Sequence, residues 1–278
     1  MAVFAVVAQA PTWTNHALAR AASRLGHLGC VLMPEAATVS LAPGDTALAR
    51  LDVRDSLDGV EDGLWELRML ERRGIRVLNS AAALGAAHDK LETAARLHAA
   101  GVPHPQTELV RGLPRIEPPL VLKPRFGSWG RDVVRCDDGR ALRYELSRGR
   151  PYELLAQELV PPRGEDLRVV VAGGSVVGAV RRVAAPGEWR TNVALGASRV
   201  PAEAPPPARA IALAAAAACG GELVGIDLLP AADGGWVALE VNGAVDFTPA
   251  YSRGGDVFAA VVTELTRDLH RRVAHELS

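Results

Sequence analysis

The pattern of hydrophobic and polar positions predicts alternating strands and helices in the first 80 residues. Residues 3–7 form a continuous apolar run rich in β-branched side chains, which is typical of a strand buried on both faces. Thr14 and Asn15 are positioned to cap a helix that follows this strand. Leucines recur at helical spacing over residues 62–73, and residues 75–78 read as a further strand. This alternation indicates a small open parallel sheet.

The rest of the chain reads as shorter strands, helices and hairpins. A small α+β unit is expected from a helix over 89–100 and strands over 106–110, 120–123, 133–136 and 153–157. Beyond it, the pattern predicts a hairpin that turns at Gly173-Gly174, a helix over 205–219, strands over 223–229 and 236–241, and a last helix from residue 256. The expected fold class is therefore α/β with an α+β part.

Composition and charge narrow the class of protein. The 278 residues are 49% hydrophobic and 23% charged, which indicates a globular chain, and the net charge of −1 argues against a general nucleic-acid binder or a basic membrane-surface protein. The three cysteines, Cys30, Cys136 and Cys219, are far apart and form no C-x-x-C pair. A disulfide framework and a cysteine zinc site are therefore not expected, and a reduced, cytoplasmic compartment fits best. The apolar N-terminus lacks a positively charged leader and reads as a strand rather than a signal peptide.

Two carboxylates and a carboxamide are expected to converge in the predicted C-terminal hairpin. Glu240 and Asn242 are two residues apart on one strand, so their side chains share a face. Asp227 lies on the preceding antiparallel strand, and the apolar neighbours Leu239 and Val241 are expected to face the other way. An all-oxygen set of this kind is typical of Mg²⁺. The alternative interpretation is a solvent-exposed polar face.

A second candidate site is a glycine loop that follows an apolar strand. Lys123 stands at the end of the strand and offers a positive charge to a phosphate. Gly127 and Gly130 allow backbone N–H groups to approach an anion closely, and Ser128 adds a donor. The loop matches neither the Walker A pattern nor the Rossmann fingerprint. On its own it is equally compatible with an ordinary turn.

Several polar residues near the predicted hairpin form a third group. It contains Arg168, Arg181, Arg182, Arg190 and Asn192. Clustered arginines are most often solvated, and because Arg181 and Arg182 are adjacent on a strand, only one of them can face the cleft. The strand ending at residues 157–160 has a backbone that could pair with an adenine edge, although its composition does not require this.

Taken in order, these segments resemble the ATP-grasp superfamily, specifically the RimK-type amino-acid ligases, over residues 75–247. The set is most similar to LysX-like ligases, which attach α-aminoadipate or glutamate to a small acidic carrier protein. The matching motifs are His88-Asp89-Lys90, Lys123-Pro124, Gly127-Ser128-Trp129-Gly130-Arg131, Gln157-Glu158, Glu165-Asp166-Leu167-Arg168, Glu188-Trp189-Arg190-Thr191-Asn192, Gly225-Ile226-Asp227 and Glu240-Val241-Asn242.

The resemblance implies an ATP-grasp fold and a role for each matching residue. An N-terminal parallel α/β domain would cover 1–87, a small lid subdomain 88–160 and a large C-terminal subdomain 161–278. Arg182 and Asn192 would contact the reacting phosphate and the metal. ATP would be bound by Lys90, Lys123, Gly127, Ser128, Trp129, Gly130, Arg131, Asp132, Val133, Gln157, Glu158, Leu159 and Val160, with Asp166 beside the ribose. Two Mg²⁺ ions, replaceable by Mn²⁺, would be bound by Asp227, Glu240 and Asn242.

The implied reaction is an ATP-dependent carboxylate–amine ligation through an acyl phosphate, with release of ADP and phosphate. The partners would be an amino acid of the glutamate or α-aminoadipate type and a carrier protein or small molecule, and the protein would form a dimer or tetramer. No nucleic acid or membrane partner is expected. A kinase that phosphorylates a hydroxyl and a non-catalytic ATP-binding module remain open alternatives. If Arg182 stabilises the transferred group, Arg182→Ala should slow turnover roughly 10²–10³-fold with folding intact.

Overall fold

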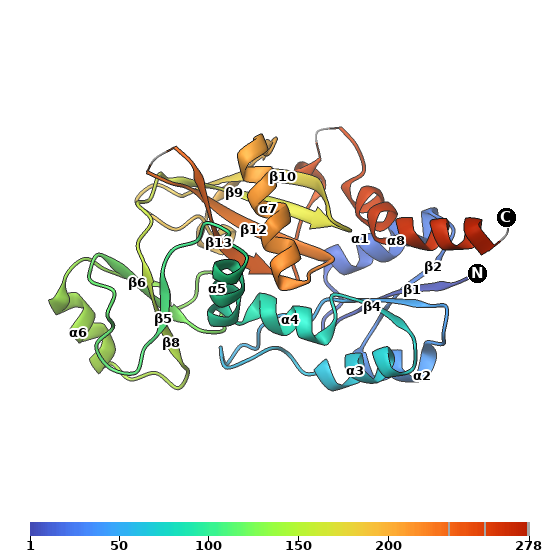
Figure 1. The fold of residues 1–278 in the computed structure, drawn as a ribbon, viewed down its shortest axis with the longest axis horizontal. Helices are drawn as coiled ribbons and strands as arrows, with labels where there is room; N and C mark the ends of the chain where they lie inside the picture. Colours follow the sequence, from blue (N-terminus) through green and yellow to red (C-terminus); the bar gives the residue numbers. More distant parts are fainter. Residues whose placement is uncertain (233, 253, 277–278) are drawn as a thin grey trace.

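The chain folds around three β-sheets, shown in Figure 1. The computed structural model describes residues 1–232, 234–252 and 254–276, with side chains described up to residue 267. The sheets follow one another along the sequence: a parallel sheet at the N-terminus, a small antiparallel sheet, and a five-stranded antiparallel sheet. The expected mixed α/β class is confirmed.

The N-terminal sheet is entirely parallel, as the alternation of strands and helices predicted. Its order is β2-β1-β3-β4. The strands are β1 (Val3–Val7), β2 (Leu28–Leu32), β3 (Thr46–Ala49) and β4 (Arg76–Leu78), and the helices are α1 (Trp13–Arg24), α2 (Pro34–Ser40) and α3 (Leu64–Arg72). The expected cap of α1 is wrong: the hydroxyl of Thr12 accepts the hydrogen bond from the Asn15 backbone, whereas Thr14 and Asn15 lie buried inside the helix.

Two helices lead from the parallel sheet into the small antiparallel sheet. These are α4 (Ala81–His88) and α5 (Lys90–Ala99), capped by Ser80 and Asp89. The small sheet has the order β5-β8-β6-β7. Its strands are β5 (Thr107–Leu109), β6 (Leu120–Pro124), β7 (Val134–Cys136) and β8 (Leu154–Glu158), and α6 (Gly139–Ser147) packs on it.

The five-stranded sheet has the order β11-β10-β9-β12-β13, and all neighbours are antiparallel. Its strands are β9 (Glu165–Ala172), β10 (Ser175–Val183), β11 (Ser198–Ala202), β12 (Leu223–Pro230) and β13 (Trp236–Asn242). The helices α7 (Pro206–Cys219) and α8 (Val257–Glu276) and the short 3₁₀ turns η1 (Val193–Leu195) and η2 (Pro249–Tyr251) complete this part. The hairpin predicted at Gly173-Gly174 is confirmed.

The two faces of the five-stranded sheet are buried differently, and this positions the site. Val169 and Val171 point to the face covered by α7. Val170 and Val180 lie on the opposite face, in a core shared with α1 and α8. The apolar core covers only part of this second face. Arg168, which shares the face with Val170 on β9, carries a charged side chain there. The rest of this face is therefore left to a polar cavity.

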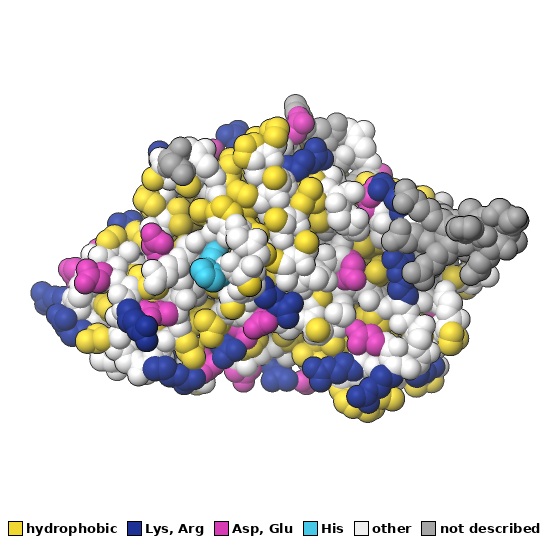
Figure 2. Space-filling view, viewed as in Figure 1, with side chains coloured by type: hydrophobic (Ala, Val, Ile, Leu, Met, Phe, Trp, Pro, Cys, Tyr) yellow, Lys and Arg dark blue, Asp and Glu magenta, His cyan; other side chains and the backbone are white. Residues whose placement is uncertain are grey.

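The distribution of charged side chains on the surface agrees with the nearly neutral net charge. On the face shown in Figure 2, basic and acidic side chains are interspersed, and apolar side chains gather over α7. Among the described residues, no helix combines the length and the apolar composition needed to cross a membrane.

Candidate active site

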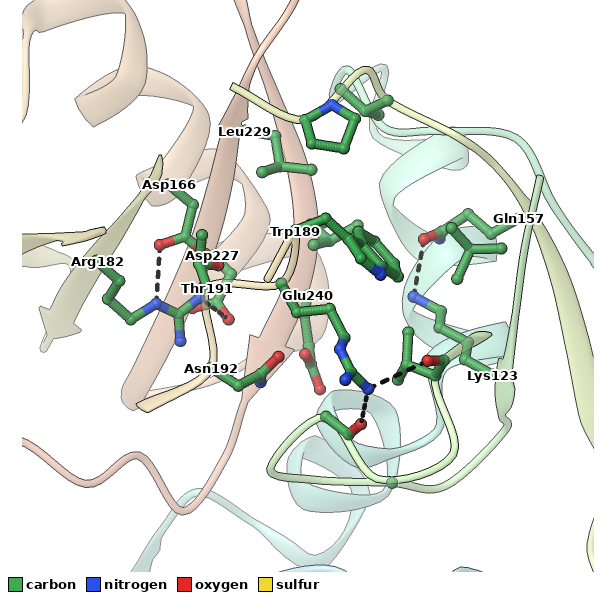
Figure 3. A pocket seen from close by; sticks show the side chains of 18 of the residues that line it. Lys123, Gln157, Asp166, Arg182, Trp189, Thr191, Asn192, Asp227, Leu229 and Glu240 are labelled. Atoms are coloured by element: carbon green, nitrogen blue, oxygen red, sulfur yellow. Dashed lines mark hydrogen bonds and ion pairs between the residues drawn. The ribbon is translucent and has the colours of Figure 1, made fainter. Parts of the chain in front are cut away.

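One cavity brings together the candidate residues from all parts of the sequence. It is an open cavity of about 1020 Å³, solvent at its mouth included, between the five-stranded sheet and the small antiparallel sheet. Figure 3 shows Lys123 and Gln157 on one wall, with Arg182, Asp166 and Asp227 facing them. The predicted residues that line it are Lys90, Lys123, Gly127, Ser128, Trp129, Gly130, Arg131, Val133, Gln157, Glu158, Leu159, Val160, Asp166, Arg182, Asn192, Asp227, Glu240 and Asn242.

Asp132 is the one predicted nucleotide-binding residue that is not among those lining this cavity. Its carboxylate accepts a hydrogen bond from the Tyr152 hydroxyl (2.5 Å), and it does not line the cavity. Its backbone has a φ of 52°, and this turn of the loop carries the side chain out toward Tyr152. A role for Asp132 in nucleotide binding is therefore not supported by its position.

Strand register places two adjacent rows of charged side chains on one face of the five-stranded sheet. Residues directly opposite each other in an antiparallel pair share a face. Asp227 lies opposite Glu240 on one side and Arg168 on the other. Arg182 lies opposite Asp166, and its other neighbour is Arg199 on the edge strand β11. Because Asp166 and Arg168 are two residues apart on β9, the charged residues form two adjacent rows: Glu240, Asp227 and Arg168 across β13, β12 and β9, and Asp166, Arg182 and Arg199 across β9, β10 and β11. We call these two rows together the charged row.

Asp227 is a buried carboxylate that stays ionised. Arg168 donates to both its oxygens (2.6 and 2.7 Å), and Arg182 Nη2 donates to Oδ2 (2.8 Å). Burial by itself would raise the pKa of Asp227, but the charges and hydrogen bonds of the two arginines outweigh it and lower the pKa to about 2. Asp227 is therefore negatively charged at physiological pH.

The opposite wall carries two lysines. Lys90 Nζ lies 2.8 Å from Glu240 Oε1 and donates to the Gly127 carbonyl (2.5 Å). Lys123 Nζ donates to Gln157 Oε1 (2.8 Å) and is 5% exposed. Burial, together with the positive charge of Lys90, lowers the pKa of Lys123 to about 8. A phosphate bound in the cavity would favour the charged form of Lys123, which burial disfavours.

Asp89 fixes the position of Lys90. Its carboxylate caps α5 by accepting from the Leu91 and Glu92 backbone N–H groups, and it also accepts from Nε and Nη2 of Arg125 (2.8 and 2.6 Å). Lys90 is the first residue of the helix that Asp89 caps. The His88-Asp89-Lys90 segment thus joins a helix start to the wall of the cavity.

The glycine loop closes over the cavity and contacts the large sheet's loops. Gly130 has a φ of 72°, and a Cβ built on it would lie 2.6 Å from Asn192 Oδ1. Arg190 Nη1 donates to the carbonyls of Gly130 (3.2 Å) and Val133 (3.3 Å). The Ser128 hydroxyl is buried and has no hydrogen-bond partner. The loop therefore offers a donor to a ligand while Arg190 holds its backbone.

The donor set fits divalent metal binding. No cluster of three His, Cys, Asp or Glu side chains occurs among the described residues, so the candidate set is two carboxylates and one carboxamide. A carboxylate has about four acceptor positions, and Asp227 uses three. Glu240 pairs with Lys90 through Oε1. The Asn242 amide donates through Nδ2 to the Gly225 carbonyl (3.4 Å), which leaves its oxygen as an acceptor. Each of the three side chains therefore retains capacity for a hard cation.

Leu239 was expected to face away from the site, and a β-bulge makes this prediction wrong. The register passes from Asp227–Glu240 to Leu228–Ala238, so Leu239 is an extra residue on β13. It lines the cavity beside Glu240 instead of facing the opposite side, whereas Val241 is buried in the core under α7. Strict alternation along a strand cannot predict a bulge.

Further cavity residues were not singled out as site residues from sequence. Trp189, Thr191 and Leu229 line the cavity, and Arg168 orients Asp227. The Thr191 hydroxyl donates to Asp166 Oδ2 (2.5 Å), and Asp166 also accepts from Arg182, so the Asp166 carboxylate is held by protein donors on the cavity wall. For Arg168 the signal was present, since it belongs to the arginine group near the predicted hairpin and to the matching motif Glu165-Asp166-Leu167-Arg168.

Comparison with known proteins agrees with this geometry. The model of the RimK-like ATP-grasp domain matches residues 87–263. The chain is 31% identical over 261 residues to the tetrahydromethanopterin:alpha-L-glutamate ligase of Methanosarcina acetivorans, which covers 79% of each protein. It is 29% identical over 219 residues to the glutamate–LysW ligase ArgX of Sulfurisphaera tokodaii, covering 74% of this chain and 78% of that protein.

The fold is shared with a solved structure as well. The crystal structure of a RimK domain ATP-grasp protein from Sphaerobacter thermophilus superposes with a TM-score of 0.69 at 23% identity, covering 95% of this chain and 99% of that one. The family model spans more than half of the chain and includes every residue of the charged row on the large sheet. The chain therefore belongs to the RimK-like ATP-grasp family of ATP-dependent acid–amine ligases.

Proposed function

We propose that the protein uses ATP to activate a substrate carboxylate as an acyl phosphate and then joins it to an amine. The observation that carries this proposal is a single cavity with buried lysines on one wall and, opposite them, a carboxylate–arginine row. Such a cavity presents cations to a polyphosphate and keeps oxygen ligands within the same space. Phosphoryl transfer needs mainly this positioning and charge compensation, and it requires no protein nucleophile.

The nucleotide would lie between the two sheets. The backbone of residues 158–160, at the end of β8, would pair with the adenine edge, and Asp166 would lie near the ribose. Lys90 and Lys123 would bind the phosphates, with the loop over residues 127–133 covering them. Asp227, Glu240 and Asn242 would hold two Mg²⁺ ions, or Mn²⁺ in their place, whose charge offsets that of the phosphate oxygens.

We propose that two residues act on the transferred group. Arg182 is 3% exposed, and it projects into the cavity from the middle of the charged row. Its guanidinium would stabilise the negative charge that develops on the phosphoryl oxygens and on the tetrahedral oxyanion. Asn192 would orient the same group from the loop that contacts Gly130.

The substrates are proposed by analogy with the relatives. Two relatives are named as ligases that use glutamate, one acting on tetrahydromethanopterin and the other on LysW. We propose an amino acid of the glutamate or α-aminoadipate type as the amine and a carrier protein or a small molecule as the carboxylate.

Hydroxylamine trapping tests the proposed reaction. The protein is incubated with ATP, Mg²⁺ and candidate carboxylates, and ADP release is followed with hydroxylamine replacing the amine. A ligase that passes through an acyl phosphate releases ADP and yields a hydroxamate. A stable phosphorylated product would show a kinase instead, and nucleotide binding without ADP release would show a binding module. Either of these results would overturn the proposal.

A further inference from the structure

Three hydrogen bonds in series join the backbone before β5 to the ammonium group of Lys123. Lys123 Nζ donates to Gln157 Oε1 (2.8 Å; Figure 3), Gln157 Nε2 donates to Thr107 Oγ1 (2.8 Å), and the Thr107 hydroxyl donates to the Pro105 carbonyl (3.0 Å). Lys123 and Gln157 line the proposed nucleotide cavity, whereas Thr107 lies outside it and lines a smaller hollow beside it. Thr107 can therefore act on a nucleotide only through Gln157.

Strand pairing places these side chains on one face of the small antiparallel sheet. Thr107 lies directly opposite Gln157 in the register of β5 and β8, and Gln157 lies opposite Val121 on β6. Lys123 is two residues beyond Val121, so it is the diagonal neighbour of Gln157, at a distance that long side chains can bridge. The series of hydrogen bonds thus crosses three neighbouring strands.

The chemistry of the groups fixes the direction of each hydrogen bond. An ammonium group has donors only, so the Gln157 amide must turn its oxygen to Lys123. The Thr107 hydroxyl has a single proton, which it gives to the Pro105 carbonyl, so it must accept from Gln157. Reversing the amide would place two donors against each other at Lys123. The hydroxyl and the ammonium group therefore hold the amide in one orientation between them.

Lys123 depends on this amide because it is almost entirely shielded from water. Lys123 and Gln157 are each 5% exposed. Within the part of the chain that the structure describes, Lys123 forms no ion pair, and the oxygen of Gln157 is the one acceptor of a hydrogen bond from its Nζ. The other titratable groups around it are Lys90 on α5, Glu240 on β13, Asp227 on β12 and, beside Gln157, His104 before β5.

We propose that Thr107 is a positioning residue of the nucleotide site, which acts through Gln157 to hold the Lys123 ammonium group in place and in its charged form. The inference rests on the proposed function, since it takes Lys123 as a phosphate-binding residue. Without the Thr107 hydroxyl, the amide would keep its contact with Lys123 only by leaving a buried N–H group without a partner, which is unfavourable. The amide would rotate, and the ammonium group would lose its fixed acceptor.

This loss should change the protonation of Lys123. A hydrogen bond to the charged form of a group favours that form, so a lysine that loses its acceptor gives up its proton at a lower pH. The charged groups that surround Lys123 are unchanged when Thr107 is replaced. A difference between the wild-type protein and a Thr107 variant therefore reports on the hydrogen bonds alone.

The composition of the chain allows the protonation of Lys123 to be measured directly. Lys90 and Lys123 are the only lysines in the sequence. Protein labelled with ¹³C at the lysine Cε therefore gives two lysine signals by NMR, and Lys123→Met identifies the signal of Lys123. Titration of that signal with pH gives the midpoint of deprotonation with no nucleotide present.

Four variants separate the hydrogen bonds from a general loss of structure. Gln157→Leu removes the acceptor and should lower the midpoint by about 1–2 pH units. Thr107→Val should lower it by roughly half as much, about 0.5–1 unit, whereas Thr107→Ser keeps the hydroxyl and the wild-type midpoint. Thr38→Val is the matched control, because the Thr38 hydroxyl donates to the Glu35 carbonyl within α2 and Thr38 lines neither hollow. Thermal unfolding checks that all four variants are folded.

Calorimetric titration of a non-hydrolysable ATP analogue with Mg²⁺ gives a second readout. At pH 9, Thr107→Val should bind the analogue about three- to tenfold more weakly than the wild-type protein. At pH 6, where Lys123 is charged in both proteins, the difference should nearly vanish. A purely structural role for Thr107 would weaken binding equally at both pH values and would contradict the inference.

The outcomes separate this inference from the proposed function. If the midpoint of Lys123 is the same in Thr107→Val and Thr38→Val, Thr107 does not act on Lys123 and the inference falls, while an ATP-dependent ligase remains possible to demonstrate by hydroxamate formation. If Thr107→Ser shifts the midpoint as far as Thr107→Val, the hydroxyl is not responsible and the inference also falls. If the midpoint shifts as expected but the wild-type protein binds no ATP analogue, the hydrogen-bonded positioning of Lys123 stands and the proposed function falls.

Discussion

Arg182 lies directly opposite Asp166 in the register of β9 and β10, and its guanidinium binds the Asp166 carboxylate through both Nε (2.8 Å) and Nη2. Nη2 also donates to Asp227 (2.8 Å). All three residues are at most 3% exposed. Arg182 on β10 therefore links its own strand electrostatically to β9 and β12, and in the proposed mechanism it also faces the reacting phosphate.

This pairing changes the expectation for Arg182→Ala. Loss of the guanidinium should slow turnover roughly 10²–10³-fold, but it also leaves two buried carboxylates short of their partner. Breaking a buried pair costs about 3–5 kcal/mol, so we expect the variant to be destabilised as well, in addition to the slower turnover expected from sequence. Parallel measurement of kcat and of urea unfolding checks this. Wild-type unfolding of the variant would show that the two ion pairs contribute little, and Arg182→Lys should recover part of the stability.

Nucleotide affinity should depend on the protonation of Lys123. Burial lowers its pKa to about 8, so the lysine loses its charge as the pH rises through that value. Only the charged form attracts phosphate, so ATP affinity should be level near pH 7 and fall by up to about tenfold per pH unit well above pH 8. Calorimetric titration of an ATP analogue between pH 7 and 9.5 measures this. Lys123→Met should bind the ATP analogue weakly, and its affinity should show no inflection near pH 8. If the inflection persists in this variant, another group causes the pH dependence.

Gly130→Ala should impair catalysis more than folding. A Cβ at this position would meet Asn192 Oδ1 at 2.6 Å, so either the loop or Asn192 has to move. The positive φ of 72° adds about 1–2 kcal/mol of backbone strain. Gly149→Ala is the matched control, because Gly149 has a φ of 61° and nothing within 4 Å of its Cβ position. Equal loss of kcat in both variants would contradict a specific contact with Asn192.

Arg50 should be required for stability rather than for nucleotide binding. Its buried side chain donates to Asn15 Oδ1 (2.6 Å) and to the Val245 carbonyl (2.8 Å), which ties β3 to the segment after β13. Arg50→Met leaves these acceptors unpaired and should lower the free energy of unfolding by about 1–3 kcal/mol. Chemical denaturation measures the loss. Arg54→Met removes only exposed ion pairs and should change stability by about 1 kcal/mol or less.

Local sequence was sufficient to predict most secondary-structure elements and most residues that line the cavity. Apolar runs, caps and glycine turns placed the parallel sheet, the hairpin at Gly173-Gly174 and the strands that carry Asp227 and Glu240. These signals act between near neighbours, so they can be read from a linear pattern. The short strand β3 and the edge strand β11 were missed, because four- and five-residue segments leave too little periodicity to recognise.

Tertiary structure decided which charges are paired and which are free. The sequence indicated that Arg182 or Arg181 would face the cleft, but strand pairing selected Arg182, placed it against Asp166, and set Arg199 beside it. It also brought Asp52, nearly 150 residues away in the chain, to a smaller cavity that it lines together with Arg199. Ion pairs and bulges depend on register between distant strands, and burial depends on how sheets pack. The types of side chain available for chemistry were thus set by sequence, whereas their partners and protonation were set by the fold.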